Sequence, residues 1–311
     1  MAQLKAIIDK LLTNASQAYI PTGFISEQIL PEISVVQKTG KLGTYGTDHL
    51  RIEAAVTGGR GKYRRVETMT RSTSSYSVDS YGLEGMVTED DYANVEAPFD
   101  AEADETMGLT TLLWVRKEKS LADVLTSTSI ITQTTTLSGT SQFSDYLNSD
   151  PLAKFSTART TIKSGCGLPP NTAIMSWEVW QQLRYHPQIL DSLGFKQNRP
   201  GGLALPELAS ALEVERVLIG MAMYESADEG QTSSLANIWG KHIVLAVCPP
   251  SAQKYQVSLG YRVQLSGRPA RRVYKSSNTN PPNSTLITCD DSYDMMISKA
   301  AAAYLIYNAV A

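Results

Sequence analysis

The stretch DAEADETMGLTTLLWVRKEKSLADVLTST, Asp100–Thr128, predicts one long helix around which the rest of the chain is organised. Its apolar residues recur at spacings of three and four, as in Leu109, Leu112 and Leu113, which is the period of a helix. Acidic residues gather at its start and basic residues in its second half, an order that suits the helix dipole. Over Asp104–Leu125 such a helix would be about 33 Å long, at about 1.5 Å per residue. We therefore expect a spine that is long for a compact domain.

The composition is that of a folded protein without a strong net charge. The chain has 311 residues, of which 42% are hydrophobic and 19% charged, enough for one large domain or two ordinary ones. A net charge of −3 gives no reason to expect a dedicated nucleic-acid binder. No apolar run reaches the ~18 residues of a membrane-spanning helix, and no basic segment leads into an apolar one at the N-terminus. We therefore expect a protein that is made and folded in the cytoplasm.

The cysteines and histidines predict neither a metal centre nor a disulfide framework. They are few and far apart in the sequence: Cys166, Cys248, Cys289, His49, His186 and His242. No zinc-binding spacing occurs among them, and no histidine has another histidine three or four residues away. Reduced, buried thiols and structural or surface histidines are the favoured interpretation, and no cofactor is expected.

Two patterns with catalytic associations fail on closer reading. The glycine-rich run Gly58–Lys62 resembles a phosphate-binding loop, but Tyr63 stands where such a loop needs a serine or threonine for magnesium. The aspartate pairs at 90–91 and 290–291 could serve metal-dependent hydrolysis, but adjacent side chains on a helix or strand point apart. A hydrolase that uses these carboxylates is the weakest of the functions considered. The sequence predicts that the chain is not an enzyme.

The N-terminal segment predicts elements with little core of their own. Residues 1–20 carry an apolar stripe at helical spacing, which predicts a short amphipathic helix. Prolines and glycines in 21–43 deny a long helix and predict an extended arm, with Phe24 and Ile25 among its apolar anchors.

A hairpin is predicted where residues 50–57 alternate like a strand and the glycine-rich turn at 58–62 leads to a second strand. Isolated hairpins are marginal in water, so this one needs a surface to lie on. The hairpin carries a basic cluster, Arg60, Lys62, Arg64 and Arg65. This cluster is either a solvated set that protects the strand edge or a contact to another copy of the chain, whose acidic stretch 89–105 has the opposite charge. The candidate inter-subunit contacts are Arg60, Lys62, Arg64, Arg65, Asp90, Asp91, Asp100, Glu102, Asp104, Phe24 and Ile25.

The second half of the chain mixes helices and strands, which predicts an α+β protein in two parts. Pro151 after Asp150 starts a helix that runs to about Lys163. The later elements expected are strands over Thr172–Ser176, Val214–Ile219, His242–Val247, Thr285–Lys299 and Ala303–Val310, and helices over Trp177–Tyr185 and Leu205–Leu212. Residues 167–254 form a compact α/β insertion in this interpretation.

Taken together, these stretches resemble the major capsid proteins of tailed phages, which have the Hong-Kong-97-type fold. The similarity lies in FISEQILPEISVVQKTGKLG (24–43), YGLEGMVTEDDYANVEAPFD (81–100), LLWVRKEKSLADVLT (112–126), NTAIMSWEVWQQLRYHPQIL (171–190), VSLGYRV (257–263) and DDSYDMMISKAAAAYLI (290–306). The resemblance covers essentially the whole chain from about residue 20. It rests on the combined pattern, since no single stretch is diagnostic.

The resemblance implies an α+β chain in four parts. These are an N-terminal arm (1–43), an extended hairpin loop with its return (44–92), a peripheral domain with the spine helix (93–166 and 255–300), and an axial domain (167–254 and 301–311). It implies a structural head protein whose copies form the pentamers and hexamers of an icosahedral shell around double-stranded DNA. The alternative is an encapsulin-like nanocompartment shell protein, which has the same fold.

The partners implied by the resemblance are other copies of the chain, a portal and a decoration protein. A separate scaffold protein or an already processed form is also implied, because no scaffolding segment precedes the arm. Packaged DNA would be contacted at its phosphates without sequence preference. No cofactor and no membrane are implied. The location implied is the virion capsid, assembled in the cytoplasm of the host bacterium.

Overall fold

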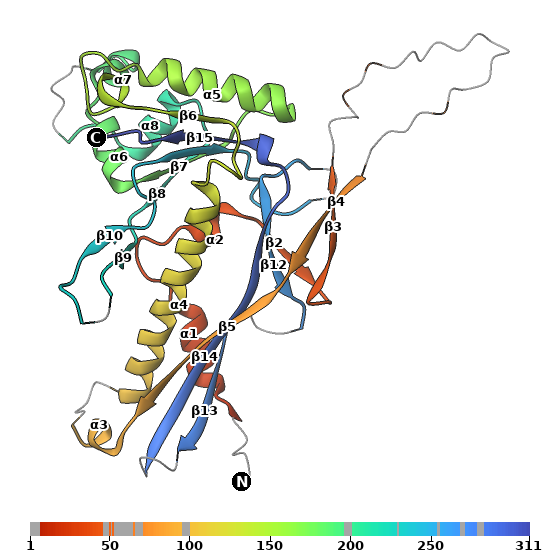
Figure 1. Cartoon of the computed structure of the whole chain (residues 1–311), viewed down its shortest axis with the longest axis vertical. Coiled ribbons are helices and arrows are strands. Elements are labelled where there is room, and N and C mark those ends of the chain that lie inside the picture. Colours follow the sequence, from red (N-terminus) through yellow and green to blue (C-terminus); the bar gives the residue numbers. More distant parts are fainter. Residues whose placement is uncertain are drawn as a thin grey trace.

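The structure is a computed structural model that describes residues 7–45, 50, 52, 65, 71–94, 100–195, 201–228, 230–253, 256–267, 271–278 and 283–311. In Figure 1 one long helix runs down the molecule and joins two units, each built on a sheet of its own. The long-strand unit holds the six-stranded sheet at the lower end, and the α/β unit holds the five-stranded sheet at the upper end. None of the described helices is both long and apolar enough to cross a membrane.

The long helix is α4, Ala101–Leu125, and it forms where the sequence predicts it. Asp100 is its N-cap, since the Asp100 carboxylate accepts a hydrogen bond from the Glu102 N–H at 3.0 Å. Glu102 and Asp104 in the first turn suit the positive end of the helix dipole. The expectation that the basic residues suit the negative end of the helix dipole is wrong. The last turn of α4 holds no basic residue, and Lys117 is buried in mid-helix.

The long-strand unit is a six-stranded sheet with α1 and α4 packed against it. Its longest strand, β14, has 14 residues and pairs with β13, β5 and β12, so it forms the axis of the sheet. All pairings are antiparallel except that of β2 with β12. The elements are α1 (Lys10–Ala18), β1 (Ile7–Ile8), β2 (Glu32–Val35), β5 (Asp79–Val87), β12 (Gly260–Leu265), β13 (Arg271–Asn278) and β14 (Ser284–Ile297).

A small apolar core joins the two helices to this sheet. Leu12 of α1 and Leu109 and Leu113 of α4 meet Val273 of β13 and Ile287 of β14. The two α4 residues lie four positions apart, so the helical period found in the sequence marks the side of the spine that faces the sheet.

The helix expected over 1–20 is shorter in the structure. Ile7–Ile8 forms β1 and is exposed, and the helix begins only after Asp9. The Asp9 carboxylate accepts hydrogen bonds from the N–H groups of Leu11 and Leu12, which sets the start of the helix. Of the expected stripe, Leu12 faces the core whereas Leu11 is exposed.

The arm expected over 21–43 is extended only in part. It contains the one-turn helix α2, Ser26–Ile29, followed by β2, which joins the six-stranded sheet. Ile29 and Leu30 are buried as expected of anchors, but Val36 is exposed.

A two-stranded ribbon leaves the body of the molecule at the upper right of Figure 1. It pairs β3, Thr39–Tyr45, with β4, Arg71–Ser77, in an antiparallel ladder. Of its described side chains, those of Tyr76 and Leu42 belong to the core that contains Tyr261 of β12. The strands that the sequence predicts over 50–70 lie outside the described residues, apart from residues 50, 52 and 65.

The α/β unit is a five-stranded sheet with a layer of helices on one face (Figure 1). β6 runs parallel to β15 and β7 to β8, whereas β11 lies antiparallel between β15 and β7. A small hairpin of β9 and β10 projects beside it. The elements are β6 (Thr134–Thr136), α5 (Pro151–Cys166), β7 (Thr172–Ser176), α6 (Trp177–Leu183), α7 (Pro187–Ser192), α8 (Leu205–Ala211), β8 (Arg216–Gly220), β9 (Met223–Glu225), β10 (Leu235–Asn237), β11 (Ile243–Ala246) and β15 (Ala303–Tyr307).

The side chains of this sheet alternate between two cores, as the period of a strand requires. Ala173, Met175 and Leu245 face the core under the helices. Ile174 and Val244 face the opposite core, which contains the C-terminal end of α4 and the anchors of the arm. The spine therefore ends against the face of the sheet that the helical layer leaves open.

The domain boundary expected at residue 166 is wrong. β6 is an edge strand of the five-stranded sheet, and α5 packs on that sheet through Phe155, Ala158 and Ile162. Residues 134–166 therefore belong to the α/β unit and not with the spine. The sequence predicts the helix that starts at Pro151 but not the sheet it covers, because an apolar face carries no mark of its partner.

Candidate functional site

The described residues bring together no catalytic group. His186 is buried with its Nε2 3.0 Å from the Ser149 hydroxyl, and burial lowers the pKa of this ring. His242 stacks on Tyr307, and burial lowers the pKa of His242 as well. His49 lies outside the described residues. Within the part of the chain that the structure describes, no group of His, Cys, Asp and Glu could hold a metal ion.

All three cysteines are buried free thiols, as the sequence predicts. Burial raises the pKa of the Cys248 thiol to about 12 and that of the Cys289 thiol to about 11. Because the thiolate is the reactive form, these two groups are inert at neutral pH. Cys166 packs in the core under the helices of the α/β unit, which agrees with the expectation of a buried thiol.

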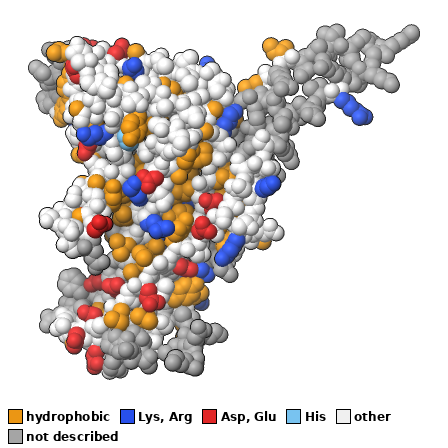
Figure 2. Space-filling model, in the orientation of Figure 1, with side chains coloured by type: hydrophobic (Ala, Val, Ile, Leu, Met, Phe, Trp, Pro, Cys, Tyr) orange, Lys and Arg blue, Asp and Glu red, His pale blue; other side chains and the backbone are white. Residues whose placement is uncertain are grey.

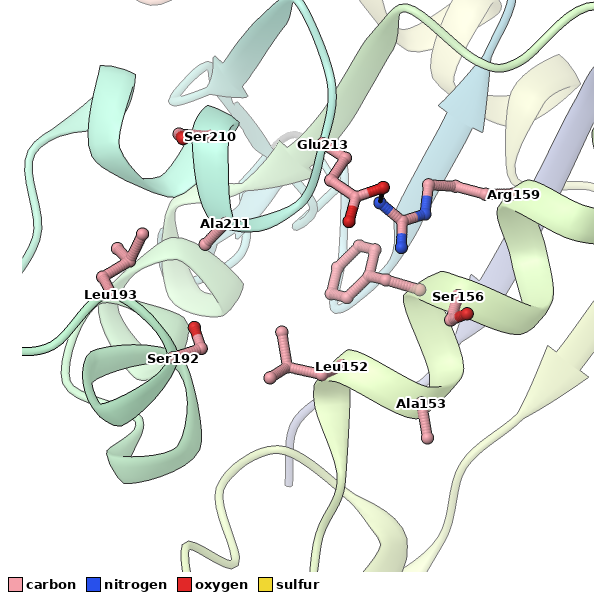
Figure 3. Close-up of a pocket in the computed structure, with 10 residues that line it drawn as sticks. Leu152, Ala153, Ser156, Arg159, Ser192, Leu193, Ser210, Ala211 and Glu213 are labelled. Carbon is pink, nitrogen blue, oxygen red and sulfur yellow. Dashed lines mark ion pairs between the residues drawn. The ribbon is translucent and has the colours of Figure 1, made fainter.

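A surface pocket of about 470 Å³ opens between α5, α7 and α8 (Figure 3). Across it the Arg159 guanidinium points toward the Glu213 carboxylate and forms an ion pair with it. The other lining side chains are apolar or hydroxyl-bearing: Leu152, Ala153, Phe155, Ser156, Ser192, Leu193, Ser210 and Ala211. A serine nucleophile needs an adjacent base; no histidine lines this pocket, and its carboxylate, that of Glu213, is held in the ion pair with Arg159.

The aspartate pair at 290–291 is split between the two faces of β14, as the strand period requires. Asp290 pairs with Arg272 of the neighbouring strand. Asp291 is buried and lies 3.6 Å from Arg271 and 3.7 Å from Lys117. The two carboxylates therefore do not form a joint site, and the hydrolase interpretation loses this pair.

The acidic stretch before the spine forms a surface at the lower end of the molecule, where Figure 2 shows acidic side chains gathered. We call it the acidic face and define it by Glu89, Asp90, Asp91, Asp100, Glu102 and Asp104, on α3 (Glu89–Asn94) and at the start of α4.

Two carboxylates of the acidic face cap helices. Asp91 accepts hydrogen bonds from the Thr88 N–H at 2.8 Å and the Thr88 hydroxyl at 2.7 Å at the start of α3. These bonds, first of all that from the backbone, hold the pKa of Asp91 below its usual range. Asp100 is itself the N-cap of α4 and accepts the Glu102 N–H. Both candidates thus have a role within the subunit.

Glu102 is also bound within the subunit. Its Oε1 accepts hydrogen bonds from the Tyr92 hydroxyl and from the Lys275 ammonium of β13. Burial by itself would lower the pKa of Lys275, but the hydrogen bond to Glu102 and the charges of Glu102, Tyr92 and Asp9 together outweigh burial and raise that pKa. Asp90 and Asp104 are exposed, so their carboxylates are accessible to a neighbouring copy.

The basic cluster predicted on the hairpin falls mostly outside the described residues. Arg65 is exposed, and Arg60, Lys62 and Arg64 lie among the residues that the structure does not describe. A contact between this cluster and the acidic face of another copy stays a prediction.

Phe24 and Ile25 pack on their own chain. The Phe24 ring lies 6.0 Å from that of Trp114 on the spine, measured between centroids. Ile25 is buried in the core that includes Leu121 and Leu125 of α4. The two anchors seat the arm on its own spine, and the burial of Ile25 does not support a contact to a neighbouring copy.

Sequence reasoning missed a cluster of buried charge at the middle of the spine. Lys117 is 1% exposed, and its ammonium lies 2.9 Å from the Glu27 carboxylate of the arm and 3.7 Å from that of Asp291. Burial by itself would raise the pKa of Glu27, but Lys117, with Arg262 and Arg271, outweighs it and lowers that pKa. The cluster thus ties the arm, the spine and the six-stranded sheet together.

A signal for this cluster was present in the sequence. Lys117 lies four residues after Leu113 and four before Leu121, so it occupies the apolar stripe of the helix. A charge in that position is either a break in the stripe or a buried ion with partners elsewhere in the chain. The partners come from segments far away in sequence, so the spacing alone does not name them.

The chain has curated relatives over most or all of its length, although no protein-family model matches it. It is 25% identical over 308 residues to the major capsid protein of Burkholderia phage BcepMu, a match that covers 96% of each chain. It is 26% identical over 238 residues to the major capsid protein of Pseudomonas phage JBD67, which covers 76% of this chain and 75% of the relative.

Several solved structures share the fold. A phage-related protein from Bordetella bronchiseptica RB50 matches with a TM-score of 0.75 at 22% identity, over 98% of each chain. The capsid of cyanophage P-SCSP1u matches with a TM-score of 0.62 at 10% identity, over 93% of this chain and 89% of that one. A virus-like particle from Pyrococcus furiosus matches with a TM-score of 0.54 at 11% identity, over 95% of each. At these identities the likeness concerns the fold alone.

The spine, the two sheets and the departing ribbon, together with these neighbours, define the Hong-Kong-97-type capsid fold. Sequence relatives that span the chain are major capsid proteins of phages. Along most of its length the chain is similar to major capsid proteins of phages and shares the fold of phage capsid subunits, which supports the tailed-phage major capsid protein family and a structural role in a capsid shell.

Proposed function

We propose that copies of this chain form the pentamers and hexamers of an icosahedral phage head that encloses double-stranded DNA. The observation that carries the proposal is the β3–β4 ribbon, which leaves the body of the subunit and whose described side chains share its core only through Tyr76 and Leu42. Two strands without a core are marginal by themselves, and a neighbouring copy supplies the surface that the ribbon lacks.

The acidic face is the surface that we propose for the basic hairpin of a neighbouring copy. Asp90 and Asp104 on that face and Arg65 beyond the ribbon are all exposed, so each is accessible to another chain. Opposite charges on two surfaces orient their encounter and disfavour wrong pairings. Each exposed pair would contribute about 0.2–1 kcal/mol, a small amount that is repeated at every contact of a shell.

The remaining partners follow from the same proposal. A separate scaffold protein, a portal and a decoration protein complete the head, which is assembled in the cytoplasm of the host bacterium. A net charge of −3 supports a shell that contains DNA without condensing it, with contacts confined to the phosphates. The subunit catalyses no reaction in this proposal, which the buried thiols and the pairing of the pocket's Glu213 carboxylate with Arg159 support.

Sedimentation velocity of the purified chain, alone and co-expressed with the scaffold protein, tests the proposal. We expect capsomers, tubes or closed shells, all far larger than the 33.9 kDa subunit. A stable monomer at high concentration in both preparations would overturn it.

The nanocompartment alternative differs in what the shell contains. The curated relatives do not favour it, since both are phage major capsid proteins. The contents of purified particles separate the two functions. Double-stranded DNA packaged in the presence of the other head proteins supports the phage head, and an enzyme co-purifying in fixed proportion inside the shell supports the nanocompartment.

A further inference from the structure

One buried carboxylate joins three parts of the chain at a single turn of the spine. Glu118 of α4 is fully buried. Its Oε2 accepts a hydrogen bond from the Ser26 N–H of the arm at 2.8 Å, and the Ile25 N–H lies 3.1 and 3.2 Å from its two oxygens. Its Oε1 also accepts the indole N–H of Trp239, in the α/β unit, at 2.7 Å. A buried carboxylate is costly unless hydrogen bonds compensate it, so these donors are required where Glu118 sits.

The arm is attached to the α/β unit at the same place. The Met221 N–H donates to the Gly23 carbonyl at 3.1 Å. Ile25 and Ile29 of the arm share a core with Leu121 of the spine and with Trp239. The arm therefore crosses the junction between the spine and the α/β unit and contacts both, and Glu118 binds the arm at this crossing.

The neighbouring residue attaches the same turn to the other unit. Successive residues of a helix point about 100° apart. Lys117 accordingly lies against Asp291 of the long-strand unit, whereas Glu118 faces Trp239 of the α/β unit. The side chains of Lys117 and Glu118 thus bind the same turn of the spine to both units.

We propose that Glu118 is a positioning residue that fixes the angle between the spine and the α/β unit. It does so by clamping the arm and Trp239 to one turn of α4. We call Glu118, Ile25, Ser26 and Trp239 the spine clamp. The proposal concerns the single subunit; that a fixed angle also sets the curvature of a shell is a consequence that rests on the proposed function.

Distance measurement between two spin labels on the unassembled full-length chain tests the clamp. Labels at Leu112→Cys on the spine and Leu147→Cys in the α/β unit use side chains that are 57% and 93% exposed. The native cysteines are buried, so they stay unlabelled in the folded subunit. Glu118→Gln keeps the size of the side chain but turns one acceptor oxygen into a donor that faces an N–H group. Asp123→Asn makes the same change at an exposed position of the same helix and is the matched control.

We expect a broader, shifted distance distribution in Glu118→Gln and an unchanged one in Asp123→Asn. In the same Glu118→Gln subunit, hydrogen exchange at the Ile25 and Ser26 amides should lose about tenfold in protection, the loss expected for one buried hydrogen bond. Exchange along α4 should stay as it is. Trp239→Phe, which removes the indole donor and keeps an aromatic ring, should broaden the distances as well.

Unchanged distances and unchanged exchange at the arm amides in a folded Glu118→Gln subunit would overturn the proposal. Loss of protection along the whole of α4 would also overturn it, because it would show a general loss of stability. If Glu118→Gln does not fold, Trp239→Phe decides, and an unchanged distance distribution in that variant counts against the clamp. Every measurement is made on single subunits, so a failure of shell assembly does not affect the test of the spine clamp.

Discussion

Two lysines on the same helix show how burial decides what a charge does in this subunit. Lys117 is 1% exposed and lies between the carboxylates of Glu27 and Asp291. Lys119, two residues on, forms an exposed pair with Asp123. Breaking a buried pair leaves an uncompensated ion and costs about 3–5 kcal/mol, whereas an exposed pair contributes about 0–1 kcal/mol. The sequence places Lys117 in the apolar stripe of the helix, but only the packing shows which carboxylates it binds.

Replacing the buried lysine should therefore destabilise the subunit strongly. We expect Lys117→Met to lower the free energy of unfolding by about 3–5 kcal/mol, because Glu27 and Asp291 both lose the buried ammonium that lies between them. The same substitution at Lys119 should change it by less than about 1 kcal/mol. Urea denaturation of the two variants measures the difference. Equal losses in both would contradict the role that the structure gives to Lys117.

Glu27 should make the subunit sensitive to acid. Its pKa is lowered in the folded state, because the neighbouring cations outweigh the effect of burial. A carboxyl group with a lowered folded pKa contributes stability above its unfolded pKa of about 4.3, and that contribution is lost as the pH falls through the folded pKa. Glu27→Gln should be less stable than the natural chain at neutral pH and should lose less stability on acidification below about pH 4.3. Urea denaturation over a pH series measures both curves, and parallel curves would count against this account.

At the scale of elements, the junction between the spine and the α/β unit depends on one close approach. A Cβ added at Gly220, at the end of β8, would lie 2.0 Å from Cδ1 and 2.5 Å from Nε1 of Trp239. The Trp239 ring is buried and hydrogen-bonded to Glu118, so it cannot move aside without losing these contacts. Gly108, inside α4, has no atom within 4 Å of the equivalent position.

The two glycines should respond to alanine in opposite ways. Gly220→Ala should destabilise the subunit by about 1–3 kcal/mol, since Trp239 must move and its bond to Glu118 is lost. Gly108→Ala should stabilise it by about 0.5–1 kcal/mol, because glycine is a poor helix former and the added methyl meets open space. Thermal or urea unfolding of both variants measures these changes. Destabilisation by both substitutions would show that the contact with Trp239 is not the cause.

The elements that the sequence predicts well are those whose signals are local. β7 occupies Thr172–Ser176 as predicted, and α5 begins at Pro151 with the Asp150 carboxylate accepting the Ala153 N–H at 3.0 Å. The misplaced features depend on distant packing. The sheet that α5 covers and the buried partners of Lys117 come from segments far along the chain. The spacing of apolar residues within a helix does not identify such partners.

For the whole molecule, the sequence and its resemblance indicate the fold class but only part of the candidate site. Ile25 was expected at a neighbour and lies in its own core, and Asp91, Asp100 and Glu102 have partners within the subunit. Charge in a sequence shows that a surface is acidic, but it does not show which carboxylates are already used for caps and ion pairs. Asp90 and Asp104 are exposed as well, and they stay candidates for the contact with a neighbouring copy.

A charge exchange between the two predicted surfaces tests the contact between subunits. Asp90→Lys with Asp104→Lys should reduce the yield of shells and leave the subunit folded, because both side chains are exposed. Adding Arg64→Glu and Arg65→Glu to the same chain should restore part of the yield, since the two surfaces again carry opposite charges. Light scattering during assembly and circular dichroism of the subunit measure the two properties. The defect should grow at low salt, where exposed charges are screened less. An unchanged yield in the aspartate variant would remove these residues from the interface.

The most direct test of the central claim is a cryo-electron microscopy map of the particles that this chain forms with its scaffold protein. The account predicts closed shells of pentamers and hexamers, in which the two-unit subunit fits as a body and the β3–β4 ribbon of each copy lies over the acidic face of the next. The absence of particles would contradict the account. So would a shell into whose subunit density the spine and the two sheets do not fit.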